Sequence, residues 1–227
     1  MLMERGQIPY FITFLTTWSL GILWVKSMKL KLQRKALQLP IMPSAADYVL
    51  APRTAPIILR RIYAMVDNPR HFVVLNRIEA ALSNLRNIGR ISDVSEILTT
   101  QAGNDDDHMV SSYSLVKGFV WAIPVLGFVG TVLGLSEAIG SFGGVLSKSE
   151  DLANLTIALK DVTAGLSVAF DTTLLGLVAS LFVQLLIVTL MKREEDFLHD
   201  CTEFCHIQVV GRLRLLDADQ PAAPAKN

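Results

Sequence analysis

A carboxylate inside an apolar segment is the residue of this chain best placed to do chemistry. Asp171 begins a stretch that reaches Met191 without another charged residue. An ionised Asp at the centre of a membrane helix costs about 3 kcal/mol, so such a residue is normally buried against partners or water and usually serves ion movement. The sequence therefore predicts that Asp171 belongs to an ion pathway.

Small and hydroxyl-bearing residues follow single faces of two apolar segments. At about 100° per residue, one stripe falls within about 80° and contains Gly127, Thr131, Gly134, Ala138 and Ser141. On the next segment Thr173, Ser180 and Gln184 share a face about 40° wide, and Thr163 and Ser167 add polar groups near the outer end. The stripes either line an ion pathway or form hydrogen bonds between packed helices, which use the same residue types.

Two cysteines raise the alternative of a metal site. Cys201 and Cys205 lie four residues apart on an expected tail helix and are flanked by His199 and His206. Cys205 and His206 point about 100° apart on a helix, and the spacing matches no common zinc pattern. Reduced cysteines that pack in a core are the plainer interpretation.

The sequence offers no constellation for enzymatic chemistry. It has no nucleophile with a base, no phosphate-binding glycine loop and no paired carboxylates in a soluble site. Gly127, Gly130 and Gly134 share part of a dinucleotide fingerprint, but they lie inside an apolar segment with no preceding strand. Together with Gly176 they are expected to allow close helix packing. We expect a protein that is not an enzyme and needs no cofactor.

Composition and segment length predict an all-α integral membrane protein. Hydrophobic residues make up 51% of the 227 residues and charged ones 19%, a balance typical of a membrane protein. A bilayer core about 30 Å thick needs about 20 apolar residues at 1.5 Å each. Residues 8–25, 118–142 and 162–191 meet that requirement and are predicted to be three transmembrane helices.

Basic residues predict the orientation. Five of them follow the first span within ten residues, namely Lys26, Lys29, Lys31, Arg34 and Lys35. Because positive charge is retained in the cytoplasm, residues 1–7 and the loop 143–161 are expected to be periplasmic. Residues 26–117, a helical domain, and the tail 192–227 are expected to be cytoplasmic. A cleaved signal would need charge before the apolar run and a small-residue cleavage site after it, and neither is present.

The expected cytoplasmic domain contains helices but no chemistry. Pro56 fits the first position of one helix. Residues 71–88 have apolar positions at three- and four-residue steps, with Arg77 on the opposite, polar face, and Gly89 is expected to end this helix. Asp93 suits the start of a further helix. Asp105, Asp106 and Asp107 are either a metal or partner site or, more simply, a solvated face or helix start before a helix that runs into the second span.

Two motifs resemble those of a known family. Residues 122–134, AIPVLGFVGTVLG, and residues 169–177, AFDTTLLGL, are similar to the two pore-span motifs of the MotA/TolQ/ExbB proton-channel family. The layout is also similar, with an outside N-terminus, one span, a large cytoplasmic helical region and two long spans around a short periplasmic loop. The specific part of the match is about 25 residues, whereas the layout covers the chain.

This resemblance implies a ring in the bacterial inner membrane, typically a homopentamer. Its second and third spans would surround the transmembrane helices of two copies of a single-span partner similar to ExbD, TolR or MotB. The partner's aspartate would take up and release the ion, and ion flow would turn the ring relative to the partner. By motif, Thr131 and Thr173 correspond to the pore threonines of the second and third spans.

The chain departs from the family at one position. ExbB-like and TolQ-like members often have a glutamate where this chain has Val168. Asp171 lies about 60° round the helix from Val168 and about 160° from Thr173. The carboxylate can substitute for that glutamate, or it can face a neighbouring span or subunit and remain protonated or paired.

The resulting hypothesis is a stator subunit that couples proton or sodium flow to work on the cell envelope or to transport. A non-conducting oligomeric membrane scaffold is the alternative. A secondary transporter is disfavoured, because the sequence shows no repeated halves around a midplane site.

Overall fold

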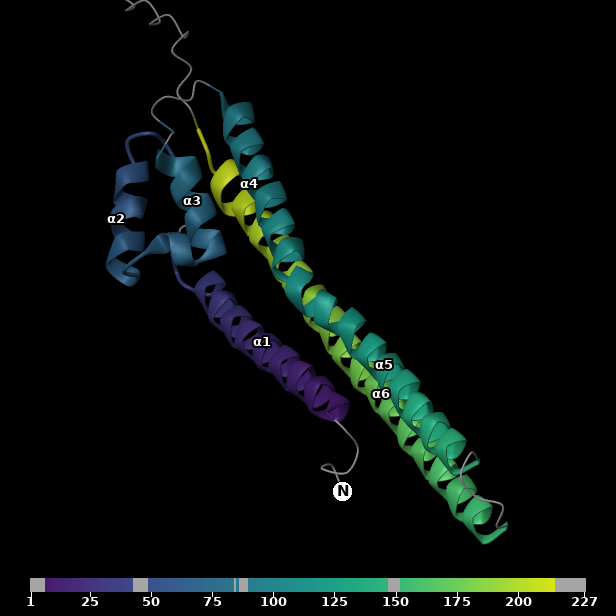
Figure 1. Ribbon diagram of the computed structural model, residues 1–227. Helices are drawn as coiled ribbons and strands as arrows, with labels where there is room; N and C mark the ends of the chain where they lie inside the picture. The colour runs from purple at the N-terminus through teal and green to yellow at the C-terminus, as the bar shows by residue number, and fades with distance from the viewer. Residues whose placement is uncertain (1–6, 43–48, 84, 86–89, 147–151, 215–227) are drawn as a thin grey trace, which may run out of the picture. The chain divides into compact units, whose positions relative to one another are not determined.

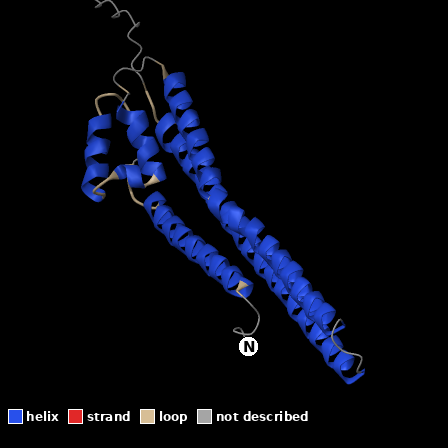
Figure 2. Cartoon of the chain, viewed as in Figure 1, coloured by secondary structure: helices blue, strands red, loops and turns tan. Residues whose placement is uncertain are grey.

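Long apolar runs form long helices in this protein. The computed structural model describes residues 7–42, 49–83, 85, 90–146 and 152–214. Three long helices dominate it, namely α1 (Ile8–Leu37), α5 (Ser114–Leu146) and α6 (Leu152–Cys205) (Figure 1). Each includes a stretch long and apolar enough to cross a membrane. Within the described ranges the regular structure is helical (Figure 2), and pairing of the β type is limited to a bridge between Leu50 and Leu213. The predicted all-helical class and the three candidate spans are confirmed.

The long helices extend beyond the apolar segments. Instead of ending near 142 and starting near 162, α5 continues to Leu146 and α6 begins at Leu152. Most of the expected loop 143–161 is therefore helical, and residues 147–151 lie outside the described part. At its other end α6 continues past Met191 to Cys205. A fall in hydropathy marks where apolar character ends, but helix propagation adds one backbone hydrogen bond per residue and continues through polar sequence.

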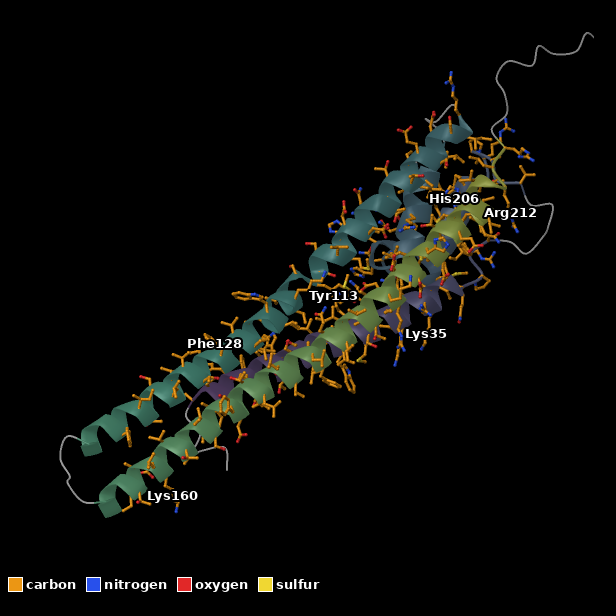
Figure 3. All side chains as sticks on the ribbon, turned by 90° about the vertical axis from the view of Figure 1, so that its right-hand side faces the viewer. Lys35, Tyr113, Phe128, Lys160, His206 and Arg212 are labelled. Carbon is orange, nitrogen blue, oxygen red and sulfur yellow. The ribbon has the colours of Figure 1, made fainter. Side chains whose placement is uncertain are left out.

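The chain divides into two compact units. The first unit is Met1–Ser27 and Ser112–Met191. In it α5 and α6 run side by side in opposite directions (Figures 1 and 3). Their hydroxyl groups bond across the contact. One face of α1 is also buried in this unit, with Ile12, Ser19 and Leu23 at seven- and four-residue steps, the spacing of a helix face.

The second unit is Met28–Ser111 and Lys192–Asn227. It contains α2 (Ala55–Met65), the 3₁₀ turn η1 (Pro69–His71), α3 (Val73–Ser83), α4 (Ile91–Ser112) and the π-helical turn η2 (His206–Val210). Pro56 lies in the first turn of α2, as predicted. Asp93 is in the first turn of α4, also as predicted. The expected helix 71–88 starts at Val73, because Phe72 is extended after the 3₁₀ turn. The helix is also shorter than predicted at its other end, because α3 ends at Ser83 and Leu85 lies in a turn. Gly89, its expected end, lies outside the described residues.

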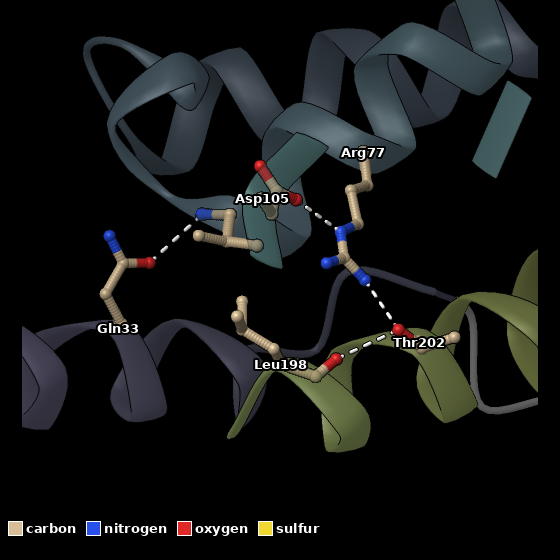
Figure 4. A network of polar contacts seen from close by, with 6 residues as sticks. Gln33, Arg77, Asp105, Leu198 and Thr202 are labelled. Atoms are coloured by element: carbon tan, nitrogen blue, oxygen red, sulfur yellow. Dashed lines mark hydrogen bonds and ion pairs between the residues drawn. The ribbon is translucent and has the colours of Figure 1, made fainter. Parts of the chain in front are cut away.

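Arg77 corrects the prediction of a polar outer face for this helix. Its side chain is 1% exposed. Nε donates to Asp105 Oδ2 at 2.7 Å and Nη1 to Thr202 Oγ1 at 2.7 Å (Figure 4). These two bonds join α3 to α4 and to α6. Arg77 is therefore buried by partners distant in sequence, although the spacing of apolar residues along α3 places it on the polar face. The acidic triplet lies within α4, not at a helix start, and a one-residue turn at Tyr113 separates α4 from α5.

A buried amide positions the start of α3. The Gln33 side chain, on α1, is 7% exposed. Its Oε1 accepts from the Val73 amide at 3.0 Å (Figure 4). Its Nε2 donates to the His71 carbonyl at 2.6 Å. The amide of Val73 belongs to the first turn of α3, which has no partner within its own helix. Gln33 therefore satisfies a helix end that would otherwise be buried without a partner.

Candidate ion pathway

The two motif segments meet through a pair of hydroxyls. Thr131 on α5 and Thr173 on α6 hydrogen-bond to each other. Thr173 Oγ1 also donates to the Gly127 carbonyl of α5 at 2.9 Å. Thr131 Oγ1 lies 3.3 Å from the Ala169 carbonyl of α6. Both side chains are half-buried, so this polar cluster lies at the edge of the α5–α6 contact.

Ser180 and Gln184 continue the face of Thr173 toward the C-terminal end of α6. Ser180 Oγ donates to the Val120 carbonyl of α5 at 3.1 Å. Gln184 lies one turn further and is exposed. The structure thus brings Thr131, Thr173 and Ser180 to one α5–α6 seam and leaves Gln184 on the surface of the single chain. Hydrogen bonding between helices, one of the two interpretations of these stripes, accounts for the three hydroxyls of the seam.

Four glycines allow this close approach. A Cβ added to Gly176 would lie 3.0 Å from the Ile123 carbonyl oxygen, and one on Gly127 would lie 3.2 Å from the Thr172 carbonyl oxygen. On Gly130 it would meet Thr172 Oγ1 at 2.7 Å, and on Gly134 it would meet Ala169 Cβ at 3.2 Å. Small residues let helix backbones approach in this way. Gly134 and Ala138 of the α5 stripe also face α6, whereas the Ser141 side chain lies outside the described part.

Asp171 is not on the seam. It is half-buried, whereas its neighbour Thr172 is 4% exposed and donates to the Ala169 carbonyl at 2.8 Å. Val168 is half-buried. The structure therefore separates the predicted carboxylate from the predicted threonine pair, as the angle of about 160° between Asp171 and Thr173 indicates.

Sequence reasoning missed Thr172 and Gly165. A Cβ added to Gly165 would lie 2.9 Å from Ala138 Cβ. Both residues lie on the face of α6 that also holds Ala169 and Gly176, within about 60° at 100° per residue. The small residues of this face can be recognised in the sequence. The predicted stripe, however, was the face of Thr173, Ser180 and Gln184, and Thr172 points about 100° away from Thr173. A second acid inside an expected span, Glu137 on α5, is exposed and was also missed.

The cysteines pack in the core of the second unit. Cys201 and Cys205 are buried and reduced, on α6, while His199 and His206 are exposed. Burial raises the pKa of Cys201 to about 12 and that of Cys205 to about 11, and nearby Arg77 opposes both shifts. Among the residues that the structure describes, no three His, Cys, Asp or Glu side chains are grouped to hold a metal ion.

Comparison with known proteins identifies the family of these helices. Residues 73–202, more than half of the 227, match the model of the MotA/TolQ/ExbB proton channel family. The matched range includes Thr131, Asp171 and Thr173. Comparison with curated proteins and with solved structures gives no match. The resemblance drawn from the two motifs is confirmed.

Proposed function

Because the chain belongs to the MotA/TolQ/ExbB proton channel family, we propose that it is the multi-span stator subunit of an inner-membrane motor. It forms a ring, with five copies as the expected number, around a dimer of a single-span partner that carries an aspartate. Proton or sodium flow between ring and partner drives work on the cell envelope or transport. The proposal assigns no covalent chemistry and no cofactor to the chain.

The observation that carries the proposal is the Thr131–Thr173 pair. Both hydroxyls come from the two family motifs, and they meet at the edge of the α5–α6 contact. A hydroxyl can donate and accept hydrogen bonds without carrying a charge. Such a pair can therefore solvate an ion, or the partner's carboxylate, in a narrow passage without fixing it there.

The scaffold remains the second candidate, because one observation favours it. Thr131, Thr173 and Ser180 all contact backbone carbonyls of the opposite helix. Hydroxyls in these bonds stabilise a helix pair by about 1 kcal/mol or less each. A scaffold would need only these stabilising hydrogen bonds between helices. An uncoupler, which dissipates the proton gradient, would leave its function unchanged.

The test is ion flux through the subunit reconstituted with its single-span partner. Thr173→Val keeps the side-chain shape and removes the hydroxyl, whereas Thr173→Ser keeps the hydroxyl, so the first should lower flux by on the order of tenfold and the second much less. Thr131→Val and Asp171→Asn are also expected to lower flux. If the reconstituted wild type carries no flux, the stator proposal fails and the non-conducting scaffold stands. If it conducts and all three disruptive variants conduct equally well, these residues do not form the ion pathway.

A further inference from the structure

One face of α2 is left uncovered by the part of the chain that the structure describes. The helix packs with its buried side against α3. On the opposite side Ile57, which is 66% exposed, and Ala64 form an apolar line. Arg60 and Arg61 are exposed and lie on the two sides of this line, each within about 60° of Ile57. The face is therefore an apolar line between two positive charges, and α2 contains no acidic residue.

The outward face of α4 is uncovered in the same way. Asp105 bonds to α3 through Arg77, so the opposite side of α4 points away from α3. On that side Thr99, Gly103 and Val110 are exposed and fall within about 40° of one another. These three residues form an uncharged line along the outward face.

Acidic residues lie on both sides of the uncharged line of α4. Asp106 lies about 60° to one side of Gly103, and Glu96 and Asp107 lie within about 40° of it on the other side. All three carboxylates are exposed, and α4 contains no lysine or arginine. The outward faces of α2 and α4 therefore have the same pattern with opposite charge.

Gly103 is a further sign that another helix approaches α4. Glycine inside a helix costs about 1 kcal/mol relative to alanine. Nothing in its own chain requires glycine at this position, because no described atom lies within 4 Å of a Cβ added to it. A residue without a side chain is required where a second backbone comes close. In this chain that place is the middle of the acidic face.

Within one chain the two faces point away from each other. In the second unit α3 lies between α2 and α4 (Figure 1), and each face is on the side of its helix that is remote from α3. Among the described residues, none of the five charged side chains of these faces takes part in an ion pair. The arginines and the carboxylates can therefore meet only between two molecules.

A second copy of the chain is the partner that fits both faces at once. In a ring of identical subunits, each copy offers one surface to one neighbour and a different, complementary surface to the other. An anionic membrane surface would pair with the arginines of α2 but would leave the carboxylates of α4 without counter-charges. Exposed ion pairs are weak singly, but membrane spans that hold the copies together raise their effective concentration.

We propose that α2 of one copy docks on α4 of the neighbouring copy. The line of Ile57 and Ala64 packs over Gly103, and the two arginines reach the carboxylates on the two sides of the α4 line. This contact rests on the proposed function, since it joins neighbours in the ring. It assigns to the acidic triplet the role of a docking surface for the same chain.

The test is crosslinking between copies in the complex with the single-span partner. In a background with Cys201→Ala and Cys205→Ala, one copy carries Ala64→Cys and a co-expressed copy carries Val110→Cys. A short bis-maleimide should join these two copies severalfold more efficiently than it joins Ala64→Cys to His108→Cys. His108 is the matched control, because it is exposed on α4 but lies about 160° round the helix from Val110.

Two sets of substitutions test what holds the contact together. Arg60→Glu with Arg61→Glu should lower the crosslinking yield by about fivefold, as expected for the loss of two exposed ion pairs. Asp106→Lys with Asp107→Lys in the other copy should restore the yield, because the charges are again opposite. Gly103→Leu should also lower it, since the added side chain has room in its own chain but not beneath a docked helix.

Each contrary result overturns the contact. Equal yields for Val110→Cys and His108→Cys mean that α2 does not meet the outward face of α4, and a charge reversal without restoration means that the charges do not hold it. Protection of Ala64→Cys from a soluble maleimide only in bilayers with anionic lipid would assign the face of α2 to the membrane surface. Crosslinking needs no ion flux, so a conducting complex without the enriched crosslink refutes the contact and leaves the stator proposal intact. A single copy in native mass spectrometry refutes the ring and the contact together.

Discussion

At the scale of residues, one turn of α6 faces three environments. Asp171 is half-buried on the side away from the seam, Thr172 is buried against α5, and Thr173 bonds to Thr131. Successive residues point about 100° apart, so no rotation of α6 about its axis places all three on one passage. The carboxylate and the threonine pair therefore serve different surfaces, and their substitutions should be analysed separately.

The two cysteines give a prediction for pH dependence. Burial raises the pKa of Cys201 to about 12 and of Cys205 to about 11, from an ordinary value of 9.0. Above pH 9 the unfolded thiols release protons that the folded thiols keep. The free energy of unfolding should therefore fall as pH rises, by up to about 1.4 kcal/mol per pH unit for each thiol.

The measurement is denaturant unfolding in detergent at pH 8 to 10.5. Lysines and tyrosines titrate in the same range, so the informative quantity is the difference between wild type and Cys201→Ala/Cys205→Ala. The variant should lose less stability than the wild type as the pH rises. Equal slopes for the two proteins would show that the thiols are accessible to solvent in the fold.

At the scale of elements, the α5–α6 contact depends on glycine. Gly176→Ala would place a Cβ 3.0 Å from the Ile123 carbonyl oxygen and 3.4 Å from Gly127 Cα. Backbone atoms cannot move aside without separating the helices, so we expect a loss of about 1–3 kcal/mol. Gly118→Ala on α5 is the matched control, because no atom lies within 4 Å of its added Cβ.

Thermal unfolding in detergent measures both glycine variants. Gly118→Ala should be neutral or slightly stabilising, since alanine is the better helix former. A neutral Gly176→Ala would mean that the helices are further apart than the seam requires, and the hydroxyl pair would then also be weaker.

The sequence predicts the existence of the elements better than their ends or their partners. Hydropathy located the three apolar helices because burial in lipid needs a long apolar run. It did not locate the N-terminus of α6 at Leu152, because helical backbone bonding does not depend on apolar side chains. Arg77 was assigned to a solvated face, because its partners Asp105 and Thr202 are remote in sequence. The motifs selected Thr131 and Thr173 individually, whereas their hydrogen bond to each other and the roles of Thr172 and Gly165 required the helix contact.

The buried ion pair of the second unit gives a prediction about helix association. Arg77→Met leaves Asp105, whose side chain is 15% exposed, without its cation. We expect a loss of about 3 kcal/mol, the lower end for a broken buried pair, because water can reach the carboxylate in part. Replacing both residues, as Arg77→Met with Asp105→Leu, should cost less than Arg77→Met alone, since no charge is left buried.

A double-mutant cycle on thermal unfolding provides the measurement. The two single variants and the double variant should be strongly non-additive, with the double variant more stable than the sum of the single effects predicts. Additive losses would show that Arg77 and Asp105 do not depend on each other in solution. Thr202→Val serves as a comparison, because it removes only the neutral partner of Arg77.

At the scale of the whole molecule, the chain enters each of its two units twice. Residues of α1 and of α6 belong to both units, with divisions at Ser27 and Met191. Each division falls next to basic residues, Lys26 and Lys29 in α1 and Lys192 and Arg193 in α6. At these two of the three divisions the unit changes where the charge changes, as expected if the first unit lies in the bilayer and the second in the cytoplasm. The third division, between Ser111 and Ser112, has no basic residue beside it.

Orientation provides the last prediction. Gln7 and Arg90 are both exposed, in the first and second units respectively. In a background with Cys201→Ala and Cys205→Ala, Gln7→Cys should react with an impermeant maleimide when the inner membrane is intact, and Arg90→Cys only after permeabilisation. Replacing the five basic residues between 26 and 35 by glutamine removes the main cytoplasmic signal, so part of the Arg90→Cys population should then label without permeabilisation. Labelling of Arg90→Cys alone in intact membranes would mean that the orientation is the reverse of the one predicted.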